Sequence, residues 1–237
     1  MNKKSKVILL PCNSYREEIV YENLEIGLEL LGGIENIVGK EESVLLKPNL
    51  LKKAEVDKAV ITHPTVVGMF ARLMREKGYQ DMALADSCGN GTTFKVIHGT
   101  GMDMYLEKLD IPVIDYTTGI HVDYSKGIQA KEFILPKELL EKDCVISLCK
   151  MKTHALERIT GAVKNSYGFV YGFHKAKRSY IVPKCRQFCP YACRSESVCE
   201  AAAVYYGRNC GHGGERTRFR RSCSNECDAD VTGSGCT

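Results

Sequence analysis

The chain has 237 residues, of which 44% are hydrophobic and 26% are charged. This composition is typical of a folded globular protein, so disorder throughout and a coiled coil are excluded. No apolar run approaches the roughly 18–20 residues that cross a bilayer. The net charge of +4 comes from 33 basic and 29 acidic residues, a balance too even to indicate nucleic acid as a partner. We therefore expect a cytoplasmic protein whose partners include neither a membrane nor nucleic acid.

The apolar spacing predicts strands and helices that alternate along the first part of the chain. A β-rich run at Lys6–Cys12 is followed by Glu17–Leu31, whose apolar residues recur at helical spacing. The next predicted segments are a strand at 43–46, a helix at 64–77, a strand at 82–85, a helix at 94–108, and strands at 112–116 and 144–148. This alternation predicts an α/β fold with a mostly parallel sheet and flanking helices.

Polar clusters follow three of the predicted strands, at 47–49, 86–91 and 150–154. In open α/β sheets, ligands bind outside the carboxyl ends of the strands. Lys47, Lys150 and Lys152, with Lys164 in the following segment, could therefore meet at one crevice and attract a carboxylate or a phosphate. The alternative for each lysine is an ordinary solvated surface residue.

Two histidines flank the last of these clusters. His154 and His174, together with Asp86 at the end of another strand, could serve as acids, bases or metal ligands. The alternative for each histidine is an ordinary hydrogen-bonding residue. Among the cysteines of this part of the chain, we expect Cys144 and Cys149 to be buried structural thiols. Cys88 lies in a glycine-rich turn and is the thiol to test for reactivity.

The composition changes abruptly after Lys177. Residues 1–177 contain 19 leucines, 20 lysines and 4 cysteines, whereas residues 178–237 contain no leucine, one lysine, 8 arginines and 8 cysteines. The second segment has too few bulky apolar residues to offset the entropy cost of ordering it. We therefore expect an incomplete α/β domain over 1–177 and a disordered or irregular Cys/Arg-rich tail over 178–237.

Three interpretations of this tail compete. A disulfide scaffold is disfavoured by the reducing cytosol. A zinc or iron–sulfur module would use the thiolates of Cys185, Cys189, Cys193 and Cys199. Their spacing is C-x3-C-x3-C-x5-C, which matches neither a zinc ribbon nor a ferredoxin run. The third interpretation is translation out of frame, which explains the exchange of lysine for arginine and of leucine for cysteine.

Several short motifs carry a family resemblance. The string K-M-K-T-H at 150–154 is followed by T-G-A-V-K-N-S-Y-G at 160–168 and by H-K-A at 174–176. The earlier strings L-K-P-N at 46–49 and T-H-P at 62–64 fit the same order. With these motifs, the chain resembles the DUF362 family from near its N-terminus to about Lys177.

The resemblance implies an α/β domain that is often joined to a ferredoxin-like module with two 4Fe-4S clusters. The patterned polar positions of the family fall here on Lys47, Asn49, Thr62, Lys150, Lys152, His154, Lys164, Asn165 and His174. Of these, His154, Lys152 and His174 are the candidate catalytic residues, and the others are candidates for substrate binding. Because the clusters belong to the module that this chain lacks, we expect no metal and no cofactor in the chain itself.

For the intact architecture, the resemblance implies an iron–sulfur-linked redox enzyme that acts on an anionic small molecule, with an electron-transfer protein as a possible partner. The truncated chain itself is expected to be inactive. One alternative is an electron-transfer or partner-binding adaptor without catalysis of its own. Another is a genuine Cys-rich metal-binding tail.

The out-of-frame interpretation gains support from codon degeneracy. If the gene is read one base further along, the codons of residues 206–223 can encode M-D-G-I-V-A-M-E-G-N-G-P-G-F-G-D-P. This string contains a signature that the family carries after the H-K-A motif. The same shift lets residues 178–180 read G-H-T, which also fits the family. One inserted adenine near the Lys177 codon would produce both matches.

Deleting one base near the Lys177 codon should therefore give a more soluble protein that unfolds more cooperatively. The restored frame can encode apolar runs such as F-A-R-M-L-V-D-L, which would complete a buried layer where the present tail has no leucine. The measurement is soluble yield and thermal unfolding of both forms. An early stop codon, or no gain in either property, would count against the change of frame.

Overall fold

The computed structural model describes residues 6–123, 132–154, 158–171, 203–208 and 215–221. Its main sheet has seven strands in the order β1-β9-β8-β6-β2-β3, with β7 paired to β6. The strands are β1 (Val7–Cys12), β2 (Val44–Pro48), β3 (Met82–Leu84), β6 (Cys144–His154), β7 (Arg158–Thr160), β8 (Ala203–Arg208) and β9 (Glu215–Arg221). The strand β2 pairs in parallel with β3 and β6, and β8 pairs in parallel with β6, whereas β9 runs antiparallel to both β8 and β1.

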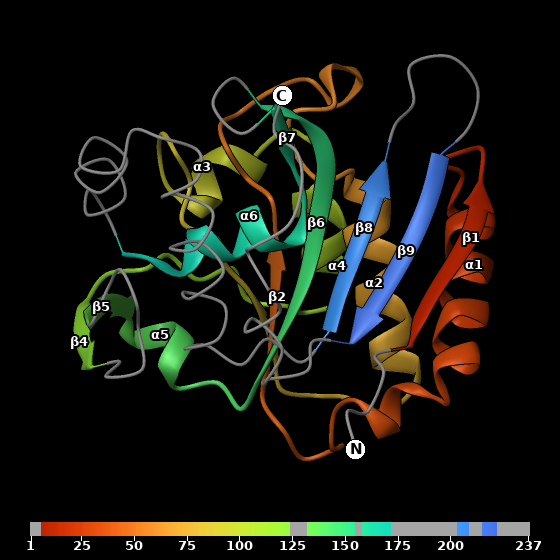
Figure 1. Ribbon diagram of the computed structural model, residues 1–237, viewed down its shortest axis with the longest axis horizontal. Helices are drawn as coiled ribbons and strands as arrows, with labels where there is room; N and C mark the ends of the chain where they lie inside the picture. The colour runs from red at the N-terminus through yellow and green to blue at the C-terminus, as the bar shows by residue number, and fades with distance from the viewer. Residues whose placement is uncertain (1–5, 124–131, 155–157, 172–202, 209–214, 222–237) are drawn as a thin grey trace, which may run out of the picture.

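Helices cover both faces of this sheet (Figure 1). The helices α1 (Glu17–Leu31), α2 (Pro64–Glu76) and α4 (Met102–Lys108) lie behind the sheet in that view, and the short α6 (Ala162–Ser166) lies in front of it. The remaining helical elements are α3 (Thr93–Ile97), α5 (Lys137–Leu140) and the 3-10 turns η1 (Ile34–Asn36), η2 (Val56–Lys58) and η3 (Tyr167–Phe169). A separate antiparallel pair is formed by β4 (Gly119–Asp123) and β5 (Glu132–Pro136).

The central strands are buried on both faces, as expected for parallel strands covered by helices. Because neighbouring side chains of a strand point to opposite faces, β2 sends Val44 and Leu46 into the core shared with α1, α2 and α4, and Leu45 into a second core. That second core contains Phe133 of β5 and Phe169 of η3. The α/β class with a mostly parallel centre and flanking helices is thus confirmed.

The predicted elements agree with the structure where the apolar period is regular. The helix α1 has the predicted bounds, and α2 begins at Pro64 with His63 as its N-cap. The prediction of one helix over 94–108 is wrong, because Gly99 and Gly101 adopt positive φ angles of 74° and 86° and separate α3 from α4.

Two predicted strands also differ from the structure. No regular strand forms over 112–116, where Val113 makes an isolated bridge to Leu84 at the edge of the sheet. The last predicted strand is longer than expected, because β6 runs through Lys150 to His154 and pairs at its end with β7. The polar cluster at 150–154 is therefore part of a strand and not of the loop that follows it.

Only two short pieces of the Cys/Arg-rich tail fall within the described residues, and these are the strands β8 and β9. Backbone pairing joins them to β6 on one side and to β1 on the other. The candidate metal ligands Cys185, Cys189, Cys193 and Cys199 lie outside the described residues, as does His174. Cys144 and Cys149 are buried, as predicted. No helix among the described residues is long and apolar enough to cross a bilayer.

Candidate functional site

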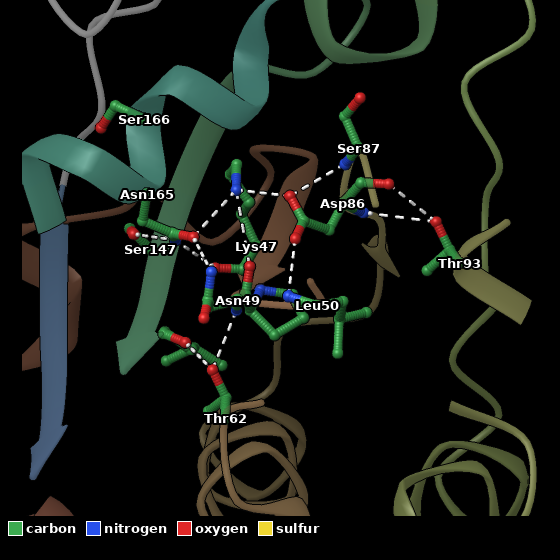
Figure 2. Close-up of polar contacts among 12 residues, drawn as sticks. Lys47, Asn49, Leu50, Thr62, Asp86, Ser87, Thr93, Ser147, Asn165 and Ser166 are labelled. Carbon is green, nitrogen blue, oxygen red and sulfur yellow. Dashed lines mark hydrogen bonds and ion pairs between the residues drawn. The ribbon is translucent and has the colours of Figure 1, made fainter. Parts of the chain in front are cut away.

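A buried ion pair joins the carboxyl ends of β2 and β3. The Lys47 ammonium lies 2.6 Å from Asp86 Oδ1, and the side chains of these residues are 0% and 4% exposed. Figure 2 shows Lys47 between Asp86 on one side and Asn165 of α6 on the other. Lys47 shares a face of β2 with Leu45, so it points toward α6 and into the protein. Its charge is therefore used inside the fold and does not face a ligand directly.

The Asp86 carboxylate also holds two backbone amides. Leu50 N–H donates to Oδ2 at 2.7 Å, and Ser87 N–H donates to Oδ1 at 2.8 Å. A hydrogen bond from the Thr93 hydroxyl to the Asp86 carbonyl oxygen, at 2.9 Å, ties the start of α3 to the same turn. One carboxylate thus fixes the loop after β2 and the loop after β3 relative to each other.

Asn165 connects α6 to the two central strands. Its Nδ2 donates to Ser147 Oγ at 2.9 Å, and its Oδ1 accepts from Lys47 Nζ at 3.2 Å and from Asn49 Nδ2 at 3.4 Å. Asn49 Oδ1 is buried and has no hydrogen-bond partner among the described residues. Burying an amide oxygen without a partner costs free energy, so Asn49 offers an acceptor that a ligand could use.

Position 168 requires a glycine, because its backbone lies close to the ion pair of Lys47 and Asp86. A Cβ atom at this position would lie 2.6 Å from Lys47 Nζ and 2.8 Å from Asp86 Oδ1. These distances are too short for any side chain to fit without displacing the pair. The glycine in the T-G-A-V-K-N-S-Y-G string therefore lets η3 close over the buried charges, with Phe169 placing its ring 5.5 Å from the Lys47 ammonium.

Thr62 links the end of β2 to β6 through two hydrogen bonds. Its hydroxyl accepts from Asn49 N–H at 2.9 Å and donates to the Leu148 carbonyl oxygen at 2.6 Å. The residue that follows, His63, caps α2 by accepting from Thr65 N–H at Nδ1. Burial, followed by the charge of Lys150, lowers the pKa of His63 to about 4. The imidazole is therefore neutral at pH 7 and carries its proton on Nε2.

Lys150 is 3% exposed and belongs to a stack of three side chains from three parts of the chain. Its ammonium donates to the Tyr15 hydroxyl at 2.7 Å and lies 5.2 Å from the centre of that ring. The Tyr15 ring stacks on His63 with the ring centres 3.4 Å apart and the planes within 6°. This stack places one buried cation on the α2 side of the end of β6.

Lys152 lies two residues further along the same strand and is half-buried. Its amine donates a hydrogen bond to the Val60 carbonyl oxygen. Burial lowers the pKa of Lys152 to about 8; the charge of Asp86 raises it, and the charges of Lys150 and Lys164 lower it. Because Asp86 is already bound to Lys47, the three lysines form a region of concentrated positive charge, here called the lysine cluster (Lys150, Lys152 and Lys164).

The structure brings most of the predicted residues to the carboxyl edge of β2 and β6. These are Lys47, Asn49, Thr62, Lys150, Lys152, Lys164 and Asn165. The half-buried His154 ends β6, where it pairs through the backbone with Arg158 of β7. The sequence reasoning did not single out the contributions of Tyr15, His63, Ser147 and Gly168.

Metal binding finds no support among the described residues, which contain no group of three or more histidine, cysteine or carboxylate side chains that could hold an ion. The four described cysteines do not form such a group either, because Cys12, Cys144 and Cys149 are buried in the fold and Cys88 lies in the turn after β3.

Residues 44–206 match the family model of DUF362, a domain of unknown function, and the chain belongs to this family. The matched range runs past Lys177, where we place the change of frame, and that interpretation stays a prediction. Among known proteins, a thylakoid-associated protein of Synechocystis sp. is 36% identical over 170 residues, which cover 72% of this chain and 52% of the relative. The chain thus spans about half the length of that relative.

A solved structure shares the fold. The lactate racemase apoprotein from Thermoanaerobacterium thermosaccharolyticum superposes with a TM-score of 0.57 at 10% sequence identity, over 86% of this chain and 52% of the racemase. At this identity, the likeness concerns the arrangement of strands and helices alone.

Replacing Asp86 by Asn should destabilise the protein by about 3–5 kcal/mol, because Lys47 is then left as a buried charge without a counter-ion. The control is Asp81→Asn, which removes an ion pair to Lys142 of nearly equal length, 2.7 Å, whose carboxylate side chain is 62% exposed, and should cost less than about 1 kcal/mol. The double variant Lys47→Met/Asp86→Asn should regain part of the loss. Equal losses for the two single variants, measured by denaturant unfolding, would show that burial of the pair has no special effect.

Proposed function

We propose that this domain binds a small carboxylate-bearing molecule at the carboxyl edge of β2 and β6. The observation that carries the proposal is the half-buried Lys152 amine, which lies within the electrostatic reach of Lys150 and Lys164 while Asp86 is engaged with Lys47. Like charges brought together in a partly buried region repel one another. A bound anion relieves this repulsion, so the energetics of the cluster favour a negatively charged ligand.

The position in the fold supports the same proposal. Lys150 and Lys152 of the lysine cluster lie in the carboxyl-terminal part of β6, which pairs in parallel with β2 and β8, and open α/β sheets bind their ligands at the carboxyl ends of such strands. The racemase that shares the fold is named for lactate, a small molecule with a carboxylate. In this proposal Lys152 and Lys164 contact the carboxylate and the buried Lys150 acts through its charge, while Asn49 Oδ1 accepts a hydrogen bond from a hydroxyl group of the ligand.

The other predicted residues have different parts in this proposal. Lys47, Thr62 and Asn165 hold the strand ends and α6 in place through buried hydrogen bonds. His154 and His174 stay candidates for acid–base catalysis, with His174 outside the described residues. We retain iron–sulfur-linked redox chemistry and an electron-transfer partner as proposals for the longer family architecture, and no step here depends on them.

Replacing Lys152 by Met should weaken binding of lactate at least about tenfold, because one charged contact to the carboxylate is removed. Binding can be followed at pH 7 by NMR titration. Above pH 8 the affinity of the unaltered protein should fall, because its Lys152, with a pKa of about 8, loses its charge there.

The matched control is Lys142→Met, which removes a lysine that lies just before β6 begins and binds Asp81. This variant should bind lactate as the unaltered protein does. If Lys152→Met and Lys142→Met bind lactate equally well, the lysine cluster is not the anion site.

A further inference from the structure

The Lys152 amine has the surroundings of a nucleophile. Its hydrogen bond to the Val60 carbonyl oxygen uses one N–H and leaves the nitrogen lone pair available when the amine is neutral. The side chain is half-buried, so water does not surround it fully. It also lies at the end of β6, where β7 pairs with the strand and fixes its position.

The neighbouring lysines are held in other contacts. Lys47 is fully buried against Asp86, and Lys150 is buried with its ammonium on the Tyr15 hydroxyl. Lys164 is half-buried and places its ammonium 5.3 Å from the centre of the Tyr167 ring. Lys47 and Lys150 are thus buried, whereas Lys152 and Lys164 are both half-buried, and Lys152 lies within the electrostatic reach of Lys150 and Lys164.

We propose that Lys152 forms a Schiff base with a 2-oxo acid whose carboxylate binds beside Lys164. This inference rests on the proposed anion site and names the substrate class for it. A 2-oxo acid carries its carboxylate on the carbon next to the carbonyl. Binding of the carboxylate at the lysine cluster therefore brings the carbonyl carbon close to the Lys152 nitrogen.

The reaction balances without an oxidant or a reductant. The neutral Lys152 nitrogen attacks the carbonyl carbon and forms a C–N bond, and the C=O π electrons move to the oxygen. One hydrogen of the nitrogen then passes to that oxygen as a proton, which gives a carbinolamine. That oxygen then leaves as water, and the nitrogen loses its second hydrogen as the C=N bond forms. Overall, an amine and a ketone give an imine and one water molecule.

The electrostatic surroundings assist the first step. A lysine near its ordinary pKa of about 10.4 is less than about 1% neutral at pH 8. With its pKa lowered to about 8, Lys152 is about half neutral at that pH. Desolvation and neighbouring cations are the means by which proteins activate lysine nucleophiles.

The test is to incubate the full chain with pyruvate and sodium cyanoborohydride, which reduces the imine to a stable adduct, and to map the modified lysine by peptide mass spectrometry. We expect the adduct on Lys152 at least about tenfold above any other lysine. Its yield should rise as the pH increases toward 8, in contrast to lactate binding, which should fall above pH 8. Lactate has no carbonyl that an amine can attack, so it should compete with pyruvate and suppress the adduct.

Variants separate the covalent step from anion binding. Lys164→Met should lower the yield of the adduct on Lys152, because the carboxylate loses its contact, whereas Lys142→Met should leave the yield unchanged. If lactate binds but pyruvate modifies all lysines equally, the Schiff base is ruled out and the anion site stands. If lactate also fails to bind, both proposals fail.

Discussion

The Lys47 ammonium has no exposed surface, and the fold tolerates it because Asp86 neutralises it at 2.6 Å. A buried charge without such a partner costs several kcal/mol, so the two strand ends that carry this pair are bound to each other. The same carboxylate also accepts from the backbone of Leu50 and Ser87. The loops after β2 and β3 and the close approach of Gly168 all depend on this one pair.

The pair also determines the charge of the surrounding edge. Among the residues that the structure describes, Asp86 is the carboxylate whose charge reaches Lys152, and it is already engaged with Lys47. The lysine cluster at the end of β6 therefore keeps its excess of positive charge. The ion pair is thus linked to the proposed anion site at the edge of the sheet. Because Asp86 binds Lys47, it does not serve as the counter-ion of the lysine cluster.

Periodicity predicted the parts of the fold that depend on apolar spacing. The bounds of α1, the start of α2 and the burial of Cys144 follow from residues close together in sequence. The break in the helix predicted over 94–108 depends on the backbone conformations of Gly99 and Gly101. The two glycines weaken the prediction of one continuous helix, but the sequence does not show where the helix breaks.

The site was predicted in composition but not in geometry. Motif positions brought Lys47, Lys150 and Lys152 to one edge of the sheet, yet they gave no sign that Lys47 points inward to Asp86. The stack of Tyr15 on His63 joins residues 48 positions apart, and only tertiary packing creates it. The requirement for glycine at 168 likewise arises from atoms of two distant strands, although the small residue within a patterned string was a signal that could have pointed to it.

The most direct test of this account is NMR of the lysine side-chain nitrogens in the unaltered protein at pH 7. If the Lys47 ammonium is buried against Asp86, its hydrogens exchange with water at least about tenfold more slowly than those of Lys58, whose side chain is 64% exposed. If the hydrogens of Lys47 and Lys58 exchange equally fast, the ammonium is open to water and the central ion pair does not exist in solution.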